Sequence, residues 1–118
     1  MCLSAAIETF VTNVFVEWYG GLTESEQESV QRVVGMLEEA GVALPFPYSS
    51  GINGSRHSGM RELRIQHAGQ PYRVLYAFDP ARNAILLIGG RKTGSGNRWY
   101  VQAIRLADRL LDEYLRGR

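Results

Sequence analysis

The sequence predicts an α+β fold: a small antiparallel β-sheet, mixed at its N-terminal strand, flanked by helices. Residues 60–92 read as three consecutive strands joined by two tight turns, and helical patterns lie before and after them. The length of 118 residues and the 45% hydrophobic content are sufficient for one modest core. We therefore expect a single domain over residues 1–118.

The N-terminal third predicts a strand followed by two helices. Residues 5–12 alternate in the manner of a strand, and residues 13–22 read as a short helix that ends at a Gly-Gly pair. Thr23 and Glu26 have the spacing of a capping box, so a second helix begins there and should end at Gly41. Its inward face should consist of Val30, Val33, Val34 and Leu37.

An irregular stretch separates these helices from the central strands. Residues 42–59 are predicted to lack helix because Pro45 and Pro47 interrupt them and glycine and serine follow. Residues 55–57 (Ser-Arg-His) either approach the sheet or belong to an ordinary surface loop.

Three strands form the centre of the prediction. Residues 62–67 alternate apolar and polar side chains, residues 72–78 carry three aromatic side chains and a valine on one side, and residues 84–88 are almost fully apolar. Residues 68–71 and 79–83 supply Gly, Pro, Asp and Asn for the turns.

The first hairpin predicts which side chains share a face. With Gly69 and Gln70 as its loop, Gln66 pairs with Arg73. The remaining pairs are Arg64–Leu75, Glu62–Ala77, Leu63–Tyr76 and Ile65–Val74. One face is then an aromatic and aliphatic core, and the other, open face holds Glu62, Arg64, Gln66 and Arg73. Two arginines on an open face are either a binding site or simply solvated.

The C-terminal part predicts a glycine-rich loop and a helix. The glycines of residues 89–97 allow backbone N–H groups to approach an anion, and Arg91 and Lys92 add charge. Residues 98–115 read as a helix with Asp108 on its solvated side. Its apolar stripe should be Tyr100, Ile104, Ala107, Leu111 and Tyr114 or Leu115.

The charge distribution indicates a local anion-binding face. Thirteen Lys and Arg against twelve Asp and Glu give a formal charge of +1, too little for a general nucleic-acid binder. Residues 56–92, however, hold seven Lys and Arg against two acids. No apolar run is long enough to span a bilayer, and a lone Cys2 suits a reducing compartment, so we expect a cytoplasmic protein.

Several short motifs occur in a specific order: ELR at residues 62–64, YRVLYAFDP at 72–80, an apolar strand, KTG at 92–94 and WY at 99–100. In this order they resemble the central block of RelE/HigB-type toxins of bacterial type II toxin–antitoxin modules, in the HigB-like branch also found in phages. The resemblance runs from about Glu8 to the C-terminus. It implies a RelE-like fold.

The resemblance also implies an activity and partners. Such toxins are ribosome-dependent mRNA endonucleases (mRNA interferases) that inhibit translation by cutting mRNA in the ribosomal A site. We expect no metal or other cofactor, because the sequence offers no visible set of metal ligands. A cognate helix-turn-helix antitoxin neutralises them, and DNA is contacted only through that antitoxin complex. No membrane partner is expected.

The predicted site combines cationic and aromatic side chains. Guanidinium and ammonium groups can stabilise charge on a phosphate attacked by a ribose 2′-hydroxyl, and a positioned proton acceptor or donor speeds the reaction. By resemblance the catalytic residues are Arg64, Arg73, Lys92 and Tyr100. The RNA-binding residues are expected to be Arg61, Gln66, Arg91 and Arg98. Tyr100 either stacks on a base, relays a proton or anchors the helix.

One departure from the family pattern and two other functions leave alternatives open. In this branch the residue before KTG is often acidic, whereas this chain has Arg91, which either removes a proton-transfer group or strengthens phosphate binding. A noncatalytic module that holds the antitoxin or RNA on the same basic face is the second hypothesis. A gyrase-inhibiting relative of the same fold is the third, and the filled basic and aromatic positions disfavour it.

Overall fold

A computed structural model describes residues 6–92 and 97–117, and within these ranges it shows a five-stranded mixed sheet flanked by three α-helices. The strand order is β1-β5-β4-β3-β2; β1 runs parallel to β5, and the other neighbours are antiparallel. The elements are β1 Thr9–Val11, α1 Asn13–Gly20, α2 Glu24–Ala40, the 3-10 turn η1 Gly41–Ala43, β2 Ser49–Gly51, β3 Arg61–His67, β4 Gln70–Phe78, β5 Ala84–Arg91 and α3 Asn97–Arg116. The predicted α+β class, mixed at the N-terminal strand, is confirmed.

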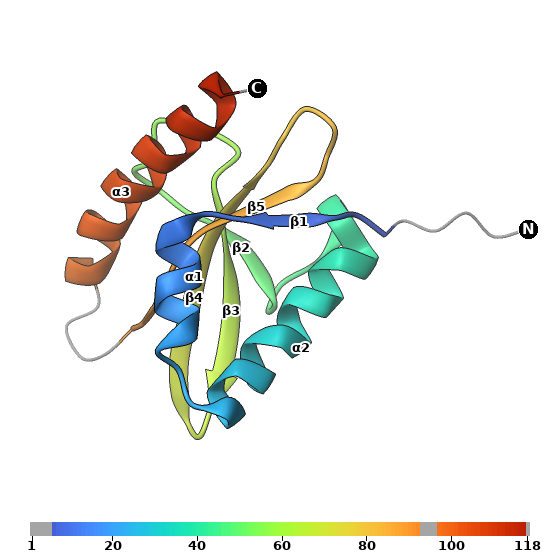
Figure 1. Ribbon diagram of the computed structural model, residues 1–118, viewed down its shortest axis with the longest axis vertical. Coiled ribbons are helices and arrows are strands. Elements are labelled where there is room, and N and C mark those ends of the chain that lie inside the picture. Colours follow the sequence, from blue (N-terminus) through green and yellow to red (C-terminus); the bar gives the residue numbers. More distant parts are fainter. Residues whose placement is uncertain (1–5, 93–96, 118) are drawn as a thin grey trace, which may run out of the picture.

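The helices pack on the two faces of the sheet. Helix α1 packs against β5 and α2 against β3, whereas α3 packs against β4 and β5 on the opposite face (Figure 1). Two cores result. The α1/α2 face buries Phe15, Val30, Val33, Leu37, Leu63, Ile65, Tyr72, Val74, Tyr76 and Leu86, among others. The α3 face buries Met60, Leu75, Ala77, Ile85, Leu87, Ala103, Ile104, Ala107 and Leu111. No helix in the described residues is both long and apolar enough to cross a membrane.

The capping box at the start of α2 is confirmed. The Thr23 hydroxyl accepts a hydrogen bond from the Glu26 N–H (3.2 Å), and the Glu26 carboxylate accepts one from the Thr23 N–H (2.7 Å). These bonds satisfy donors that a helix start otherwise leaves unpaired. The helix ends as predicted at Gly41, whose φ of 58° lies in the region that favours glycine.

The register of the β3–β4 hairpin differs from the prediction. The turn consists of Ala68 and Gly69, with φ values of 50° and 77°, and not of Gly69 and Gln70. Arg64 therefore pairs with Arg73, and not with Leu75. Moving a two-residue loop by one position moves every pairing by two residues, and side chains on a strand repeat every two residues. The predicted faces are consequently correct although the predicted partners are wrong.

Strand β5 is longer than predicted and contains two glycines assigned to a loop. Gly89 and Gly90 lie within the strand. Trp18 covers Gly89 on the α1 face of the sheet, and Trp99 covers Gly90 on the α3 face. A Cβ atom on Gly89 would lie 2.3 Å from the Trp18 ring, and one on Gly90 would lie 2.4 Å from Nε1 of Trp99. The glycines thus allow close packing of both layers. The rest of the predicted anion-binding loop, residues 93–96, lies outside the described residues, as does Cys2.

The stretch predicted to be irregular contains η1 and the short strand β2, which pairs with β3. Its end contacts α3 and not the sheet. Asp108, predicted to be solvated, is 5% exposed and accepts hydrogen bonds from the Ser55 hydroxyl and the Arg56 N–H. His57 Nε2 lies 2.8 Å from an oxygen of Asp112. The reason for the difference is that this loop folds back over the C-terminal half of α3.

Candidate active site

The candidate site is a cluster of charged and aromatic side chains on the α3 face of the sheet. Alternation along β3 and β4 places Glu62, Arg64 and Arg73 on this face, opposite the core residues Leu63 and Val74. Arg64 and Arg73 are direct cross-strand partners, so they share a face as predicted. Helix α3 brings Tyr100 to the same place.

Glu62 lies at the centre of this cluster and is only 4% exposed. Its Oε2 accepts a hydrogen bond from Arg64 Nη1 at 2.9 Å, and its Oε1 accepts one from the Tyr100 hydroxyl. The Nε of Arg73 lies 3.7 Å from Oε1, which is an ion-pair distance without a hydrogen bond. A buried carboxylate requires such partners, because an isolated charge in a protein interior is costly.

Arg73 is buried, contrary to the open face predicted for it. It is 5% exposed because β4 is an inner strand and its cross-strand neighbour Gly90 is covered by Trp99. Its Nη1 donates to the carbonyl oxygen of Tyr72 at 3.0 Å. Its Nε is the one buried side-chain nitrogen or oxygen without a hydrogen-bond partner in the described part of the chain. This N–H is therefore buried beside the Glu62 carboxylate without a hydrogen bond of its own.

Tyr100 and Lys92 close the cluster at the start of α3. Burial, and then the hydrogen bond to the Glu62 carboxylate, raise the pKa of the Tyr100 hydroxyl. Tyr100 therefore remains a neutral phenol at neutral pH. Nζ of Lys92 lies 5.7 Å from the centre of the Tyr100 ring, within the range of a cation–π contact. Of the four predicted catalytic side chains, Arg64, Arg73 and Tyr100 thus contact Glu62, and Lys92 lies over the Tyr100 ring.

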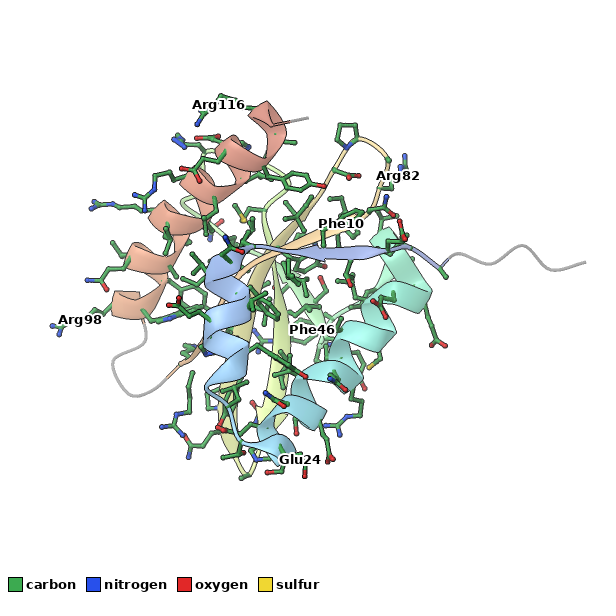
Figure 2. The ribbon with its side chains drawn as sticks, viewed as in Figure 1. Phe10, Glu24, Phe46, Arg82, Arg98 and Arg116 are labelled. Atoms are coloured by element: carbon green, nitrogen blue, oxygen red, sulfur yellow. The ribbon has the colours of Figure 1, made fainter. Side chains whose placement is uncertain are left out.

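The four predicted RNA-binding side chains do not all join them. Gln66 is exposed on the same face, and Arg98 is exposed at the start of α3, pointing away from the sheet (Figure 2). Arg61 lies on the α1/α2 face, where its Nε donates to the Ser49 hydroxyl at 3.0 Å. Arg91 also lies on that face, beside Tyr72. The structure therefore does not bring Arg61, Arg91 or Arg98 into the cluster.

Two groups near the arginines had no predicted role. The predicted face of Glu62 is correct. Glu62 is the one acidic side chain among the four predicted on that face, and this was the available signal for its central position. The ring of Phe46 lies over the guanidinium of Arg64, 5.2 Å from its carbon. Phe46 precedes β2 in a loop, and no periodic pattern indicates that contact. Across residues 6–92 and 97–117, no three His, Cys, Asp or Glu side chains form a group suited to a metal ion.

The sequence is similar to proteins with toxin names. Residues 17–112 match the family described as phage-derived protein Gp49-like. HigB2 of Mycobacterium tuberculosis is 42% identical over 99 residues, and HigB3 of the same organism is 41% identical over 98 residues. Each match covers 83% of this chain. The chain spans 49% of HigB2, about half its length, and 84% of HigB3.

The fold is similar to those of solved toxin–antitoxin complexes. A chain of the RelBE2 complex from Mycobacterium tuberculosis gives a TM-score of 0.56 at 16% identity, covering 75% of this chain and 100% of that one. A chain of the archaeal RelE–RelB complex from Pyrococcus horikoshii OT3 gives 0.53 at 14% identity, covering 73% and 94%. At these identities the likeness concerns the fold, which is RelE-like as expected.

Proposed function

We propose that this chain, which belongs to the phage-derived Gp49-like family, is a ribosome-dependent mRNA endonuclease. It would be the toxin of a toxin–antitoxin module, as the HigB names of its relatives suggest. The observation that carries the proposal is the cluster in which Arg64, Arg73 and Tyr100 contact the buried Glu62 while Lys92 lies over the Tyr100 ring. Three cations and a positioned proton route are the parts that phosphodiester cleavage by a ribose 2′-hydroxyl requires.

The arginines stabilise the reacting phosphate. The 2′-oxygen attacks phosphorus, the bond to the 5′-oxygen breaks, and the products are a 2′,3′-cyclic phosphate and a 5′-hydroxyl. Negative charge grows on the phosphoryl oxygens during this step, and the guanidinium groups of Arg64 and Arg73, which both line a cavity beside the cluster, supply positive charge for them. Lys92 adds a third positive charge at the exposed side of the cluster.

Tyr100 and Glu62 carry the proton. The Tyr100 hydroxyl donates to Glu62, so it can accept the proton of the 2′-hydroxyl while passing its own to the carboxylate. The raised pKa of Tyr100 favours this relay over a phenolate base, because the side chain stays neutral before and after transfer. The proton on Glu62 is then available to the leaving 5′-oxygen by the reverse route. Of the roles open to Tyr100, we therefore assign proton relay.

The proposed partners are those that the toxin resemblance implies. We expect the substrate to be mRNA on the ribosome and the inhibitor to be a cognate helix-turn-helix antitoxin, through which alone the complex reaches DNA. The activity belongs in the cytoplasm, where translating ribosomes are found.

Mapping of mRNA 5′ ends in a translating extract tests the proposal. The parent should produce cuts at fixed codon positions that disappear when translation is blocked. Arg73→Ala should reduce cleavage on the order of 10²–10³-fold, as expected when one transition-state donor is lost. Arg73→Lys should be partly active because a point charge cannot replace the guanidinium fork.

The matched control is Arg109→Ala, which removes an exposed arginine from α3 and should cleave as the parent does. If the parent leaves mRNA intact while it still binds its antitoxin, the chain is a noncatalytic module and the enzymatic proposal is wrong.

A further inference from the structure

A cavity of about 270 Å³ lies next to the arginine cluster, between α2 and the outer part of β3. Arg64 and Arg73 line it together with Gln66, so two of the proposed catalytic side chains belong to both the cluster and the cavity. The opposite wall comes from α2, through the apolar side chains Val33 and Met36 and the exposed Arg32. Neither the toxin resemblance nor the catalytic cluster accounts for this wall.

The loop before β2 carries two exposed aromatic side chains, one of which lines this cavity. Tyr48 lines the cavity and is 39% exposed. Phe46 lies beside the cavity, is 68% exposed, and makes a cation–π contact with Arg64, which does line it. Large aromatic side chains are usually buried at least in part, and exposed ones gathered at a cavity mark a binding surface. The loop that carries them is held against β3, since the Arg64 N–H donates to the Tyr48 carbonyl oxygen at 2.9 Å.

We propose that this cavity binds a base of single-stranded RNA, one next to the phosphate held by Arg64 and Arg73. The inference rests on the proposed function and names a second part of the same substrate site. Aromatic rings and a guanidinium plane supply stacking surfaces for a base. Gln66 supplies an amide for a base edge, and Arg32 supplies charge for the next phosphate.

The lining favours an anionic, planar ligand over a peptide. None of the lining residues, all of which lie in the described part of the chain, is acidic, and three are arginines. The volume lies just below the roughly 300–1,000 Å³ of drug-sized ligand sites, which suits one base rather than a longer segment. Arg64 contacts both Phe46 and Glu62, so we place the bound base and the phosphate in neighbouring nucleotides of one RNA strand.

Fluorescence anisotropy with a short, labelled 2′-O-methyl oligoribonucleotide measures this binding directly. The methyl group blocks the attacking oxygen, so binding is separated from cleavage. Tyr48→Ala and Phe46→Ala should each weaken binding by about 5- to 100-fold, the effect of losing one base stack. Arg32→Gln should weaken it less and reduce its salt dependence, because it removes only a phosphate contact.

Two controls make the test specific. Phe10→Ala removes an aromatic side chain of similar exposure (38%) that packs on Tyr114, away from the cavity, and should bind as the parent does. A probe of the same charge in which every nucleotide is abasic should bind the parent weakly, and Tyr48→Ala should not weaken it further.

Unchanged binding of the RNA probe by both Tyr48→Ala and Phe46→Ala would overturn the inference, as would equal binding of the abasic probe. Loss of antitoxin binding with normal RNA binding in these variants also overturns it and assigns the surface to a protein partner. The two proposals fail separately. If Tyr48→Ala weakens probe binding but the parent never cleaves mRNA, the endonuclease proposal is wrong. If the parent cleaves mRNA but Tyr48→Ala binds the probe as the parent does, the base-site proposal is wrong.

Discussion

Replacement of Arg73 tests how strongly the buried cluster is coupled. Glu62 and Arg73 are 4% and 5% exposed, so Arg73→Ala removes a cation from a site where water cannot replace it. Breaking a fully buried ion pair costs about 3–5 kcal/mol when the remaining charge has no other partner. Glu62 keeps Arg64 at 2.9 Å and the Tyr100 hydroxyl, and its distance to Arg73 Nε is 3.7 Å, so a smaller cost is expected.

The structure therefore predicts a loss of about 1–3 kcal/mol in the free energy of unfolding for Arg73→Ala. For a domain of this size that corresponds to a fall in Tm of about 4 °C per kcal/mol. The value is larger than the few tenths expected for an open strand face, where a surface substitution usually stays within about 0.5 kcal/mol.

Urea unfolding followed by circular dichroism measures this cost for Arg73→Ala, Glu62→Gln and the double variant, with Arg109→Ala as the exposed control. The two single effects should not add, and the interaction energy should be about 0.5–3 kcal/mol. If Arg73→Ala is as stable as Arg109→Ala, or if the single effects add, the cluster is not coupled and the reasoning from burial is wrong.

Two further predictions concern packing and pH. Gly90→Ala should destabilise the protein by about 1–3 kcal/mol in thermal unfolding, because its Cβ would lie 2.4 Å from Trp99. Gly35→Ala in α2, where nothing lies within 4 Å, should instead gain about 0.5–1 kcal/mol, and equal effects of the two substitutions would contradict this packing. The hydrogen bond from His57 and then the charge of Arg56 lower the pKa of Asp112 below its ordinary value of 3.8. The ionised Asp112 therefore stabilises the folded state above that pH, and this contribution is lost as the pH falls through the lower pKa of the folded state. Asp112→Asn should thus lower Tm at neutral pH but not in strong acid, with Glu113→Gln as control; an equal deficit at both pH values would show that the charge is irrelevant.

The strand pattern predicted the faces of the sheet because alternation depends on parity alone. The loop error at Gly69 changed every partner in the hairpin and left Arg64 and Arg73 on one face. The same parity argument, applied to Arg61, would have grouped it with Leu63 and Ile65 and removed it from the site. For Arg91 this was not possible, since the two preceding glycines were taken for a loop and the strand could not be followed through them.

The burial of the site could not be predicted from local pattern. Alternation indicates which face a side chain occupies but not what covers that face. Trp99 reaches β5 only because Gly90 has no side chain, and this contact joins segments whose relative placement no periodicity specifies. For the same reason the contact of Phe46 with Arg64, across an irregular loop, has no signature in the sequence.

The order of the strands has a consequence for biosynthesis. Strand β1 pairs with β5, and the Thr12 hydroxyl bonds a carbonyl group 75 residues further along. The first strand made therefore has no place in the sheet until the fifth has left the ribosome, and Tyr100 arrives later still, on the last helix. A nascent chain with both arginines but without α3 lacks the phenol that contacts Glu62. If the chain stops translation as we propose, its reactive centre is complete only after α3, with Tyr100, has been translated.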